Sequence, residues 1–240
     1  MRNHPTAIVT GASSGIGLGL TAALIEEGYC VVANSRRITA AGTLEPSDRL
    51  VLIDGDIADP DVARRIVETA VQRFGCVDLL VNNAGVFIPK PFVEYTAEDF
   101  GRLVSTNLTG FFHVTQHVVR HMRGRGTGHV VNITTTLADQ PVAGVPAAIP
   151  VLTKGGLNAV TAALAIEYAG EGIRFNAIGA GIIDTPMHKS ETHGFLKTLH
   201  PMQRIGKVSE IVDAVRYLTE ATFVTGEVLH VDGGAHAGKW

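Results

Sequence analysis

Cysteine, aromatic residues and an excess of basic charge are all scarce in this chain of 240 residues. Its two cysteines, Cys30 and Cys76, are too few for a disulfide framework. Both stand in apolar surroundings, which predicts two reduced, buried thiols. The net charge is −3, so the chain offers no basic field for a phosphate backbone. We therefore expect no nucleic-acid partner.

The chain also lacks a long apolar run. No apolar stretch approaches the roughly 20 residues that span a bilayer. Residues 1–5 lead into a strand without the apolar core of a signal peptide. Hydrophobic residues nevertheless make up 45% of the chain and charged residues 18%, a balance typical of a well-filled globular core. We expect a soluble, cytoplasmic protein with no membrane partner.

Short apolar runs alternate with longer stretches of helical periodicity, a pattern typical of a parallel sheet covered on both faces. The predicted strands are Ala7–Thr10, Cys30–Asn34, Leu50–Asp54, Leu79–Asn82, His129–Ile133, Arg174–Ile178 and Val228–Val231. The predicted helices lie near Gly15–Glu27, Pro60–Phe74, Ala97–Arg123, Pro150–Ala169 and Ser209–Glu220. No linker, internal repeat or low-complexity tract divides the chain. We predict a single α/β domain over residues 1–240, a doubly wound Rossmann domain with a seven-stranded parallel sheet and helices on both faces.

Two connections depart from the regular alternation. Ile38–Arg49 contains Gly42 and Pro46 and has few apolar residues at helical spacing, which predicts a loop or a short helical turn. His188–Gly206 is polar and holds three of the ten histidines. It follows a strand at the end of the sheet where open α/β folds bind their ligands. We expect residues 188–206 to form a loop that covers the substrate.

A glycine-rich turn joins the first strand to the first helix. It contains Gly11, Ser13, Ser14, Gly15, Ile16 and Gly17. Glycine permits the tight reversal and the close approach of backbone to phosphate, and the helix start supplies free amide groups and a positive dipole end. The turn could also be an ordinary glycine-rich connection. Its place between the first strand and the first helix favours a pyrophosphate site.

Further motifs extend this pattern over nearly the whole chain. They are Asn82-Asn83-Ala84-Gly85, Asn107, Thr153-Lys154, Asp184-Thr185-Pro186-Met187 and Val231-Asp232-Gly233-Gly234. Together with the glycine turn, and in this order, they resemble the short-chain dehydrogenase/reductase family. The resemblance implies a nicotinamide cofactor and a small-molecule substrate. It also implies cofactor contacts from Asp56, Ile57, Asn83, Ala84, Gly85, Lys154, Ile183 and Thr185.

The end of the second strand indicates which nicotinamide cofactor is preferred. Dinucleotide folds that select NAD(H) place an acid there to bind the ribose hydroxyls, whereas this chain has Ser35, Arg36 and Arg37. Guanidinium groups bind phosphate in a charge-assisted, two-pronged manner, so we expect NADP(H) to be preferred over NAD(H). The arginines could instead be a solvated loop, and Ser14 stands where NADP-preferring relatives often carry a basic residue. Asp56 could likewise be a turn or capping residue.

The resemblance also implies catalytic residues, and one of them is missing. Asn107 and Lys154 match the family's asparagine and lysine, and Thr135 matches the hydroxyl that orients the carbonyl, with Thr134 and Thr136 as alternatives. The family's proton donor is a tyrosine four residues before the lysine, where this chain has Pro150. None of the four tyrosines replaces it in the sequence pattern. Candidate substitutes are His188, His193, Lys154 itself or a water molecule.

Two functions remain open at this point. One is an atypical NADP(H)-dependent oxidoreductase acting on a small carbonyl, alcohol or imine. The alternative is an NADP(H)-binding protein with little or no turnover, serving as a sensor, partner subunit or structural relative. No metal site is expected in either case. The apolar residues of two long helices, namely Phe111, Phe112, Val118, Val119, Leu157, Val160, Leu164 and Tyr168, exceed what one sheet face needs, and they predict a homotetramer.

Overall fold

The computed structural model describes residues 4–238 and contains a single seven-stranded sheet. The strands are β1 (Thr6–Thr10), β2 (Cys30–Ser35), β3 (Leu50–Asp54), β4 (Leu79–Asn82), β5 (Gly128–Ile133), β6 (Ile173–Ala180) and β7 (Val228–Val231). All pairings are parallel, in the order β3-β2-β1-β4-β5-β6-β7. The predicted doubly wound Rossmann architecture is therefore confirmed.

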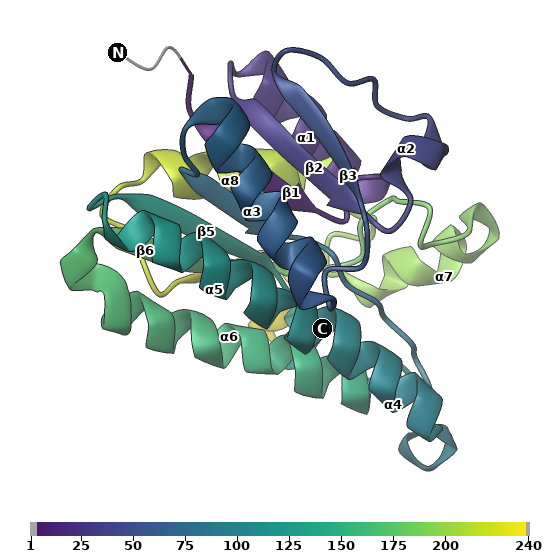
Figure 1. The fold of residues 1–240 in the computed structure, drawn as a ribbon. Coiled ribbons are helices and arrows are strands. Elements are labelled where there is room, and N and C mark those ends of the chain that lie inside the picture. The colour runs from purple at the N-terminus through teal and green to yellow at the C-terminus, as the bar shows by residue number, and fades with distance from the viewer. Residues whose placement is uncertain (1–3, 239–240) are drawn as a thin grey trace.

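Helices cover both faces of the sheet (Figure 1). The helices are α1 (Gly15–Glu26), α2 (Ile38–Ala41), α3 (Pro60–Phe74), α4 (Ala97–Val104), α5 (Gly110–Arg123), α6 (Ala148–Tyr168), α7 (His193–Leu196) and α8 (Val208–Glu220). Helices α3, α5 and α6 lie on the near face of the sheet in Figure 1, and α1 and α8 on the far face. The short α7 lies beyond the carboxyl ends of the strands.

Each face of the sheet has its own apolar core. On the far face, Leu20 and Leu24 of α1 and Ile211 of α8 pack against alternate residues of the central strands. On the near face, Ile66 of α3 and Val118 of α5 pack against the strand residues of opposite orientation. Because both sides of each central strand are covered, β1 and β2 read as continuous apolar runs instead of alternating ones. Cys30 and Cys76 are free and buried, as expected.

The main departures from the predicted elements concern helices. The predicted helix over residues 97–123 contains a π-helical turn, Ser105–Thr109, between α4 and α5. Such single-turn bulges are common at functional sites, and this one carries Asn107. The connection after β2 forms only the four-residue α2, which confirms the expected short helical turn. Helix α6 begins two residues before its predicted start. Strand β6 begins one residue earlier and ends two residues later than predicted.

One helical segment combines great length with an apolar composition. Residues Ala148–Glu171 form a helical stretch of 24 residues that is apolar and long enough to cross a membrane by length and composition alone. Threonine, lysine and glycine interrupt its apolar residues, so they form no continuous apolar run in the sequence. In the fold, the stretch begins with α6, which buries Leu157, Thr161 and Ala165 against the sheet. A helix that packs against the core in this way needs an apolar face.

Candidate functional site

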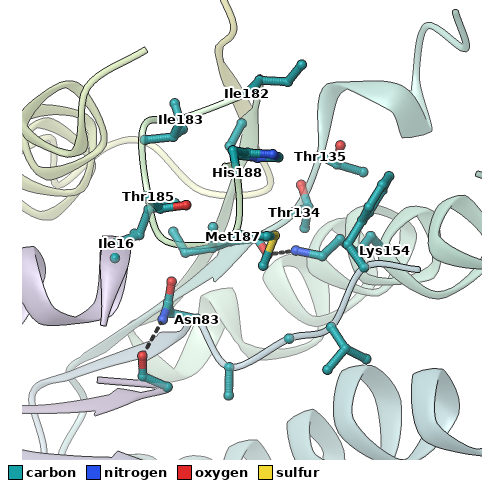
Figure 2. Close-up of a pocket in the computed structure, with 18 of the residues that line it drawn as sticks. Ile16, Asn83, Thr134, Thr135, Lys154, Ile182, Ile183, Thr185, Met187 and His188 are labelled. Carbon is teal, nitrogen blue, oxygen red and sulfur yellow. Dashed lines mark hydrogen bonds between the residues drawn. The ribbon is translucent and has the colours of Figure 1, made fainter. Parts of the chain in front are cut away.

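A cleft of about 1050 Å³ opens at the carboxyl ends of the strands. The cleft lies at the topological switch point of the sheet. There β1 has β2 as its neighbour on one side and β4 on the other. Figure 2 shows part of its lining, with Asn83, Thr134 and Lys154 on one side and Ile183, Thr185 and His188 on the other.

The glycine turn forms one wall of this cleft, and its backbone requires glycine. Gly11 and Gly15 have positive φ angles of 67° and 53°, a region that side chains disfavour. Gly17 is tighter still, since a Cβ atom there would stand 2.3 Å from the Gly11 carbonyl oxygen. The side chain of Ser14, the residue before α1, makes no capping hydrogen bond to the helix. The first amide groups of α1 therefore have no side-chain cap from this residue, as an anion site requires.

The turn is fixed by Thr10 and Asn83. The Thr10 hydroxyl oxygen accepts hydrogen bonds from the backbone amides of Asn83 and Ala84, both at 3.1 Å. In return, Asn83 Nδ2 donates to the carbonyl oxygens of Thr10 and Gly11 at 3.0 and 3.1 Å. The chain after β4 is thereby joined to the chain after β1, as the dashed line at Asn83 in Figure 2 illustrates. These hydrogen bonds hold in place the wall of the cleft that the glycine turn forms.

At the far end of the cleft, the end of β2 presents positive charge. Arg36 and Arg37 are exposed and line the cleft together with the partly buried Ser35. Within residues 4–238, no carboxylate forms an ion pair with either arginine. Asp56 also lines the cleft, and its Oδ1 accepts from the Ala58 amide at 2.9 Å. That bond is a turn contact, as the alternative interpretation of Asp56 expects.

The three threonines after β5 have different partners. Thr134 donates to the carbonyl oxygen of Ile178 at 3.2 Å, and Thr136 donates to the Asp232 carboxylate at 2.5 Å. The Thr135 hydroxyl instead accepts from the Leu137 amide at 3.3 Å, so its own proton is not spent on that bond. All three line the cleft, but Thr135 alone keeps a hydroxyl proton for a ligand. This favours Thr135 over Thr134 and Thr136 as the hydroxyl that orients a carbonyl group.

Lys154 reaches the cleft from α6. Its Nζ donates to the Ile133 carbonyl oxygen at 3.1 Å, the second dashed bond in Figure 2. Burial in a largely apolar environment lowers the pKa of Lys154 from 10.5 to about 8. Nζ also lies beside Gly85, where a Cβ atom would stand 3.6 Å away. A lysine that retains a proton at neutral pH but releases it readily suits proton transfer.

Asn107 supports this region from behind. It is buried in the π-helical turn, where its Oδ1 accepts from the Val86 amide at 2.8 Å. Its Nδ2 donates to the Val86 carbonyl oxygen at 3.1 Å and to Thr153 Oγ1 at 3.0 Å. Asn107 therefore ties the loop after β4 to α6 one residue before Lys154. Together with Lys154 it lines a second cavity of about 10 Å³ behind the main cleft.

Pro150 is buried in the first turn of α6, where a missing amide proton carries little penalty. It supplies no proton, and it does not line the cleft. None of the four tyrosines, all of them described, lines the cleft either. The hydroxyl of Tyr95 donates to the Ile88 carbonyl oxygen at 2.6 Å.

The segment 188–206 covers part of the cleft. It consists of two 3₁₀ turns, Ser190–Thr192 and Lys197–Leu199, on either side of α7. Its base is fixed where the Gly206 amide donates to the Ile182 carbonyl oxygen at 2.8 Å. From this segment, His188, Phe195, Leu196, Leu199 and His200 line the cleft. His193 does not; its Nε2 lies 3.8 Å from the Asp184 carboxylate.

Sequence reasoning missed His200. Its ring is buried, and Nε2 accepts from the Ile182 amide at 3.0 Å, which fixes the end of β6 against the covering segment. No local signal identifies this contact, because the two residues are 18 apart in the chain.

The cleft brings together most of the residues singled out from the sequence. Those that line it are Gly11, Ser13, Ser14, Gly15, Ile16, Ser35, Arg36, Arg37, Asp56, Ile57, Asn83, Ala84, Gly85, Thr135, Lys154, Ile183 and Thr185. Gly17 and Asn107 do not, since the former packs against Gly11 and the latter lies behind Lys154. The glycine cradle, the helix start and the unpaired arginines together fit a dinucleotide.

Comparison with known proteins agrees with this geometry. Residues 11–236 match the family described as enoyl-(acyl carrier protein) reductase. The 3-oxoacyl-(acyl-carrier-protein) reductase of Thermotoga maritima is 34% identical over 95% of this chain and 96% of its own length. The chain belongs to the short-chain dehydrogenase/reductase family, and the relatives that it matches are oxidoreductases.

Solved structures of this family superpose closely. A 3-ketoacyl-(acyl-carrier-protein) reductase from Brucella melitensis, complexed with NADH, has a TM-score of 0.89 at 31% identity, covering 97% of this chain and 98% of that one. A gluconate 5-dehydrogenase from Burkholderia cenocepacia, complexed with NADP and tartrate, has a TM-score of 0.88 at 30% identity, covering 98% and 96%. The fold thus accommodates either nicotinamide cofactor.

Proposed function

We propose that this protein is an NADP(H)-dependent oxidoreductase acting on a small carbonyl compound or the corresponding alcohol. The observation that carries the proposal is one continuous cleft, which joins the glycine turn and the two arginines to Thr135 and Lys154. The relatives support an oxidoreductase, and the NADP complex of the gluconate 5-dehydrogenase supports a nicotinamide cofactor. The residues of this chain give the more specific assignments.

The proposed cofactor contacts follow the length of the cleft. The start of α1 binds the pyrophosphate, while Arg36 and Arg37 bind the 2′-phosphate and Asp56 and Ile57 contact the adenine end. The loop after β4, with Lys154, Ile183 and Thr185, holds the nicotinamide half. When bound, the cofactor supplies or accepts a hydride. Thr135 then orients the carbonyl oxygen, and residues 188–206 cover the substrate.

Two measurements test this function. Titration calorimetry gives the dissociation constants of NADPH and NADH, and steady-state oxidation of NADPH is followed with a panel of aldehydes, ketones and imines. The proposal predicts tighter binding of NADPH and oxidation that depends on a carbonyl substrate. Failure of the protein to bind either nucleotide would contradict the proposed function.

A second candidate is an NADP(H)-binding protein with little turnover. The specific observation in its favour is Pro150, which removes the family's proton donor while the nucleotide half of the cleft stays intact. Against it stands Asn107, which a pure binding module does not need for chemistry. Tight NADPH binding without oxidation by any member of the panel would support this second candidate.

We further propose a homotetramer in the cytoplasm. Of the eight apolar residues that predicted assembly, Val118, Val119 and Leu157 are buried within the protomer, and Phe112 is the one that is largely exposed. Phe100, Leu152 and Ile166 add exposed apolar surface on α4 and α6. Sedimentation equilibrium at micromolar concentration is expected to give four times 25.4 kDa, and a pure 25.4 kDa species would contradict it.

A further inference from the structure

Six residues that line the cleft carry titratable side chains. They are Arg36, Arg37, Asp56, Lys154, His188 and His200. The first three follow β2 and β3, which are separated from β5 by β1 and β4 in the sheet. With neighbouring strands about 4.8 Å apart, these groups cannot reach a carbonyl held by Thr135 at the end of β5. Lys154 and the two histidines remain.

His200 is excluded by its hydrogen bonds. Its Nε2 accepts the proton of the Ile182 amide, so the ring is neutral and carries its own proton on Nδ1. Nδ1 is itself buried, out of contact with the open cleft. His188 is unsuited to the acid role for a different reason. Burial, reinforced by His193, lowers its pKa, so at neutral pH its ring is uncharged and a poor proton donor.

Lys154 meets the geometric requirement. Its ammonium group has three N–H donors, and the Ile133 carbonyl oxygen takes one of them. Ile133 is two residues before Thr135, so the ammonium group and the carbonyl-orienting hydroxyl belong to the same end of β5. The groups packed around Nζ from β5, from the loop after β4 and from the π-helical turn are uncharged: Ile133, Gly85 and Asn107. His188, a titratable group of the facing segment, lines the same cleft (Figure 2).

We propose that Lys154 takes over the acid role of the absent tyrosine and delivers the proton to the substrate oxygen. This inference rests on the proposed oxidoreductase function. In reduction, the carbonyl carbon receives the hydride, one N–H bond of the ammonium group breaks, and the new O–H bond completes the alcohol. The neutral amine then regains a proton from water. In oxidation the same amine accepts the alcohol proton.

A titration of Lys154 that needs no cofactor tests the first half of the inference. The protein is labelled with trace acetic anhydride at a series of pH values, and mass spectrometry measures the modification of Lys154 against the exposed lysines of the same chain. The reactivity of Lys154 should rise with a midpoint near pH 8. A midpoint at pH 10 or above would overturn the inference, whatever the activity of the enzyme.

The pH dependence of reduction tests the second half. At saturating NADPH the rate should be highest below pH 8 and fall as pH rises through 8, because the acid form is lost. Lys154→Arg keeps a positive charge but cannot release it, so the limb near pH 8 should vanish and the rate should drop about 10²- to 10⁴-fold. Calorimetry on the same variant measures NADPH binding separately. His188→Gln should retain the limb.

The outcomes separate this inference from the function beneath it. A limb that persists in Lys154→Arg, or that disappears in His188→Gln, would assign the proton to another group and leave the oxidoreductase function intact. A wild-type protein that binds NADPH but reduces no carbonyl compound overturns both.

Discussion

Replacing Arg36 with alanine should reduce the preference for NADPH while leaving NADH binding nearly unchanged. Arg36 is exposed at the end of β2, and no carboxylate among residues 4–238 pairs with it. Binding a phosphate therefore breaks no existing ion pair. A charge-assisted hydrogen bond contributes about 1.5–3 kcal/mol, and exposure places this contact at the lower end. The expected loss is about tenfold in NADPH affinity.

The matched variants sharpen this prediction. Ser35→Asp adds a carboxylate at the position where NAD-selective folds carry one, so it should weaken NADPH further and strengthen NADH. Arg73→Ala, at the exposed end of α3, removes the same charge away from the cleft and should change neither.

Calorimetric titration with both nucleotides at low and high salt is the assay. Salt should weaken NADPH binding to the wild type more than to Arg36→Ala, because screening acts on the lost contact. Equal NADPH and NADH affinities in the wild type would refute the reasoning from the end of β2.

Three further variants test the site and the fold. Gly17→Ala drives a Cβ atom against the Gly11 carbonyl oxygen and should raise the dissociation constant of NADPH at least tenfold, as measured by calorimetry, whereas Gly156→Ala, with open space around it, should not. Pro150→Tyr returns a phenol one helical turn before Lys154 and should move the fall in the rate of ketone reduction away from pH 8, because the phenol then supplies the proton; a folded variant that keeps the limb at pH 8 would contradict the alignment of Pro150 with the family acid. Burial lowers the pKa of His129 from 6.5 to about 3, so its neutral form stabilises the fold above pH 6.5, and that stability is lost as pH falls toward 3. This amounts to about 2 kcal/mol between pH 7 and 5 in urea unfolding, and His129→Gln should remove that loss; an equal loss in the variant would show that other groups cause it.

The sequence predicted the sheet well because both of its faces are buried. Strands such as β1 and β4 are short apolar runs bounded by polar or glycine residues, and period and length suffice to recognise them. The π-helical turn at Ser105–Thr109 was not predictable in this way, since its residues are compatible with a continuous helix. Within this turn Asn107 contacts Val86 and Thr153, which lie far away in the chain, and the sequence does not show these contacts.

The candidate site was predicted unevenly for a similar reason. Motif residues that line the cleft could be named, but the choice among Thr134, Thr135 and Thr136 required their hydrogen-bond partners. His193 looked as plausible as His188 in the sequence, yet only His188 lines the cleft. Such distinctions arise from tertiary contacts between segments far apart in the chain.

Transfer of deuterium is the most direct measurement of the proposed reaction. The wild-type protein is incubated with a reducible carbonyl compound and NADPH carrying deuterium at the nicotinamide C4 position, prepared as each of its two stereoisomers. Mass spectrometry of the alcohol should show deuterium at the carbinol carbon with one stereoisomer and none with the other. Deuterium absent from every product, in a protein shown by calorimetry to bind NADPH, would contradict an oxidoreductase and leave a nucleotide-binding protein.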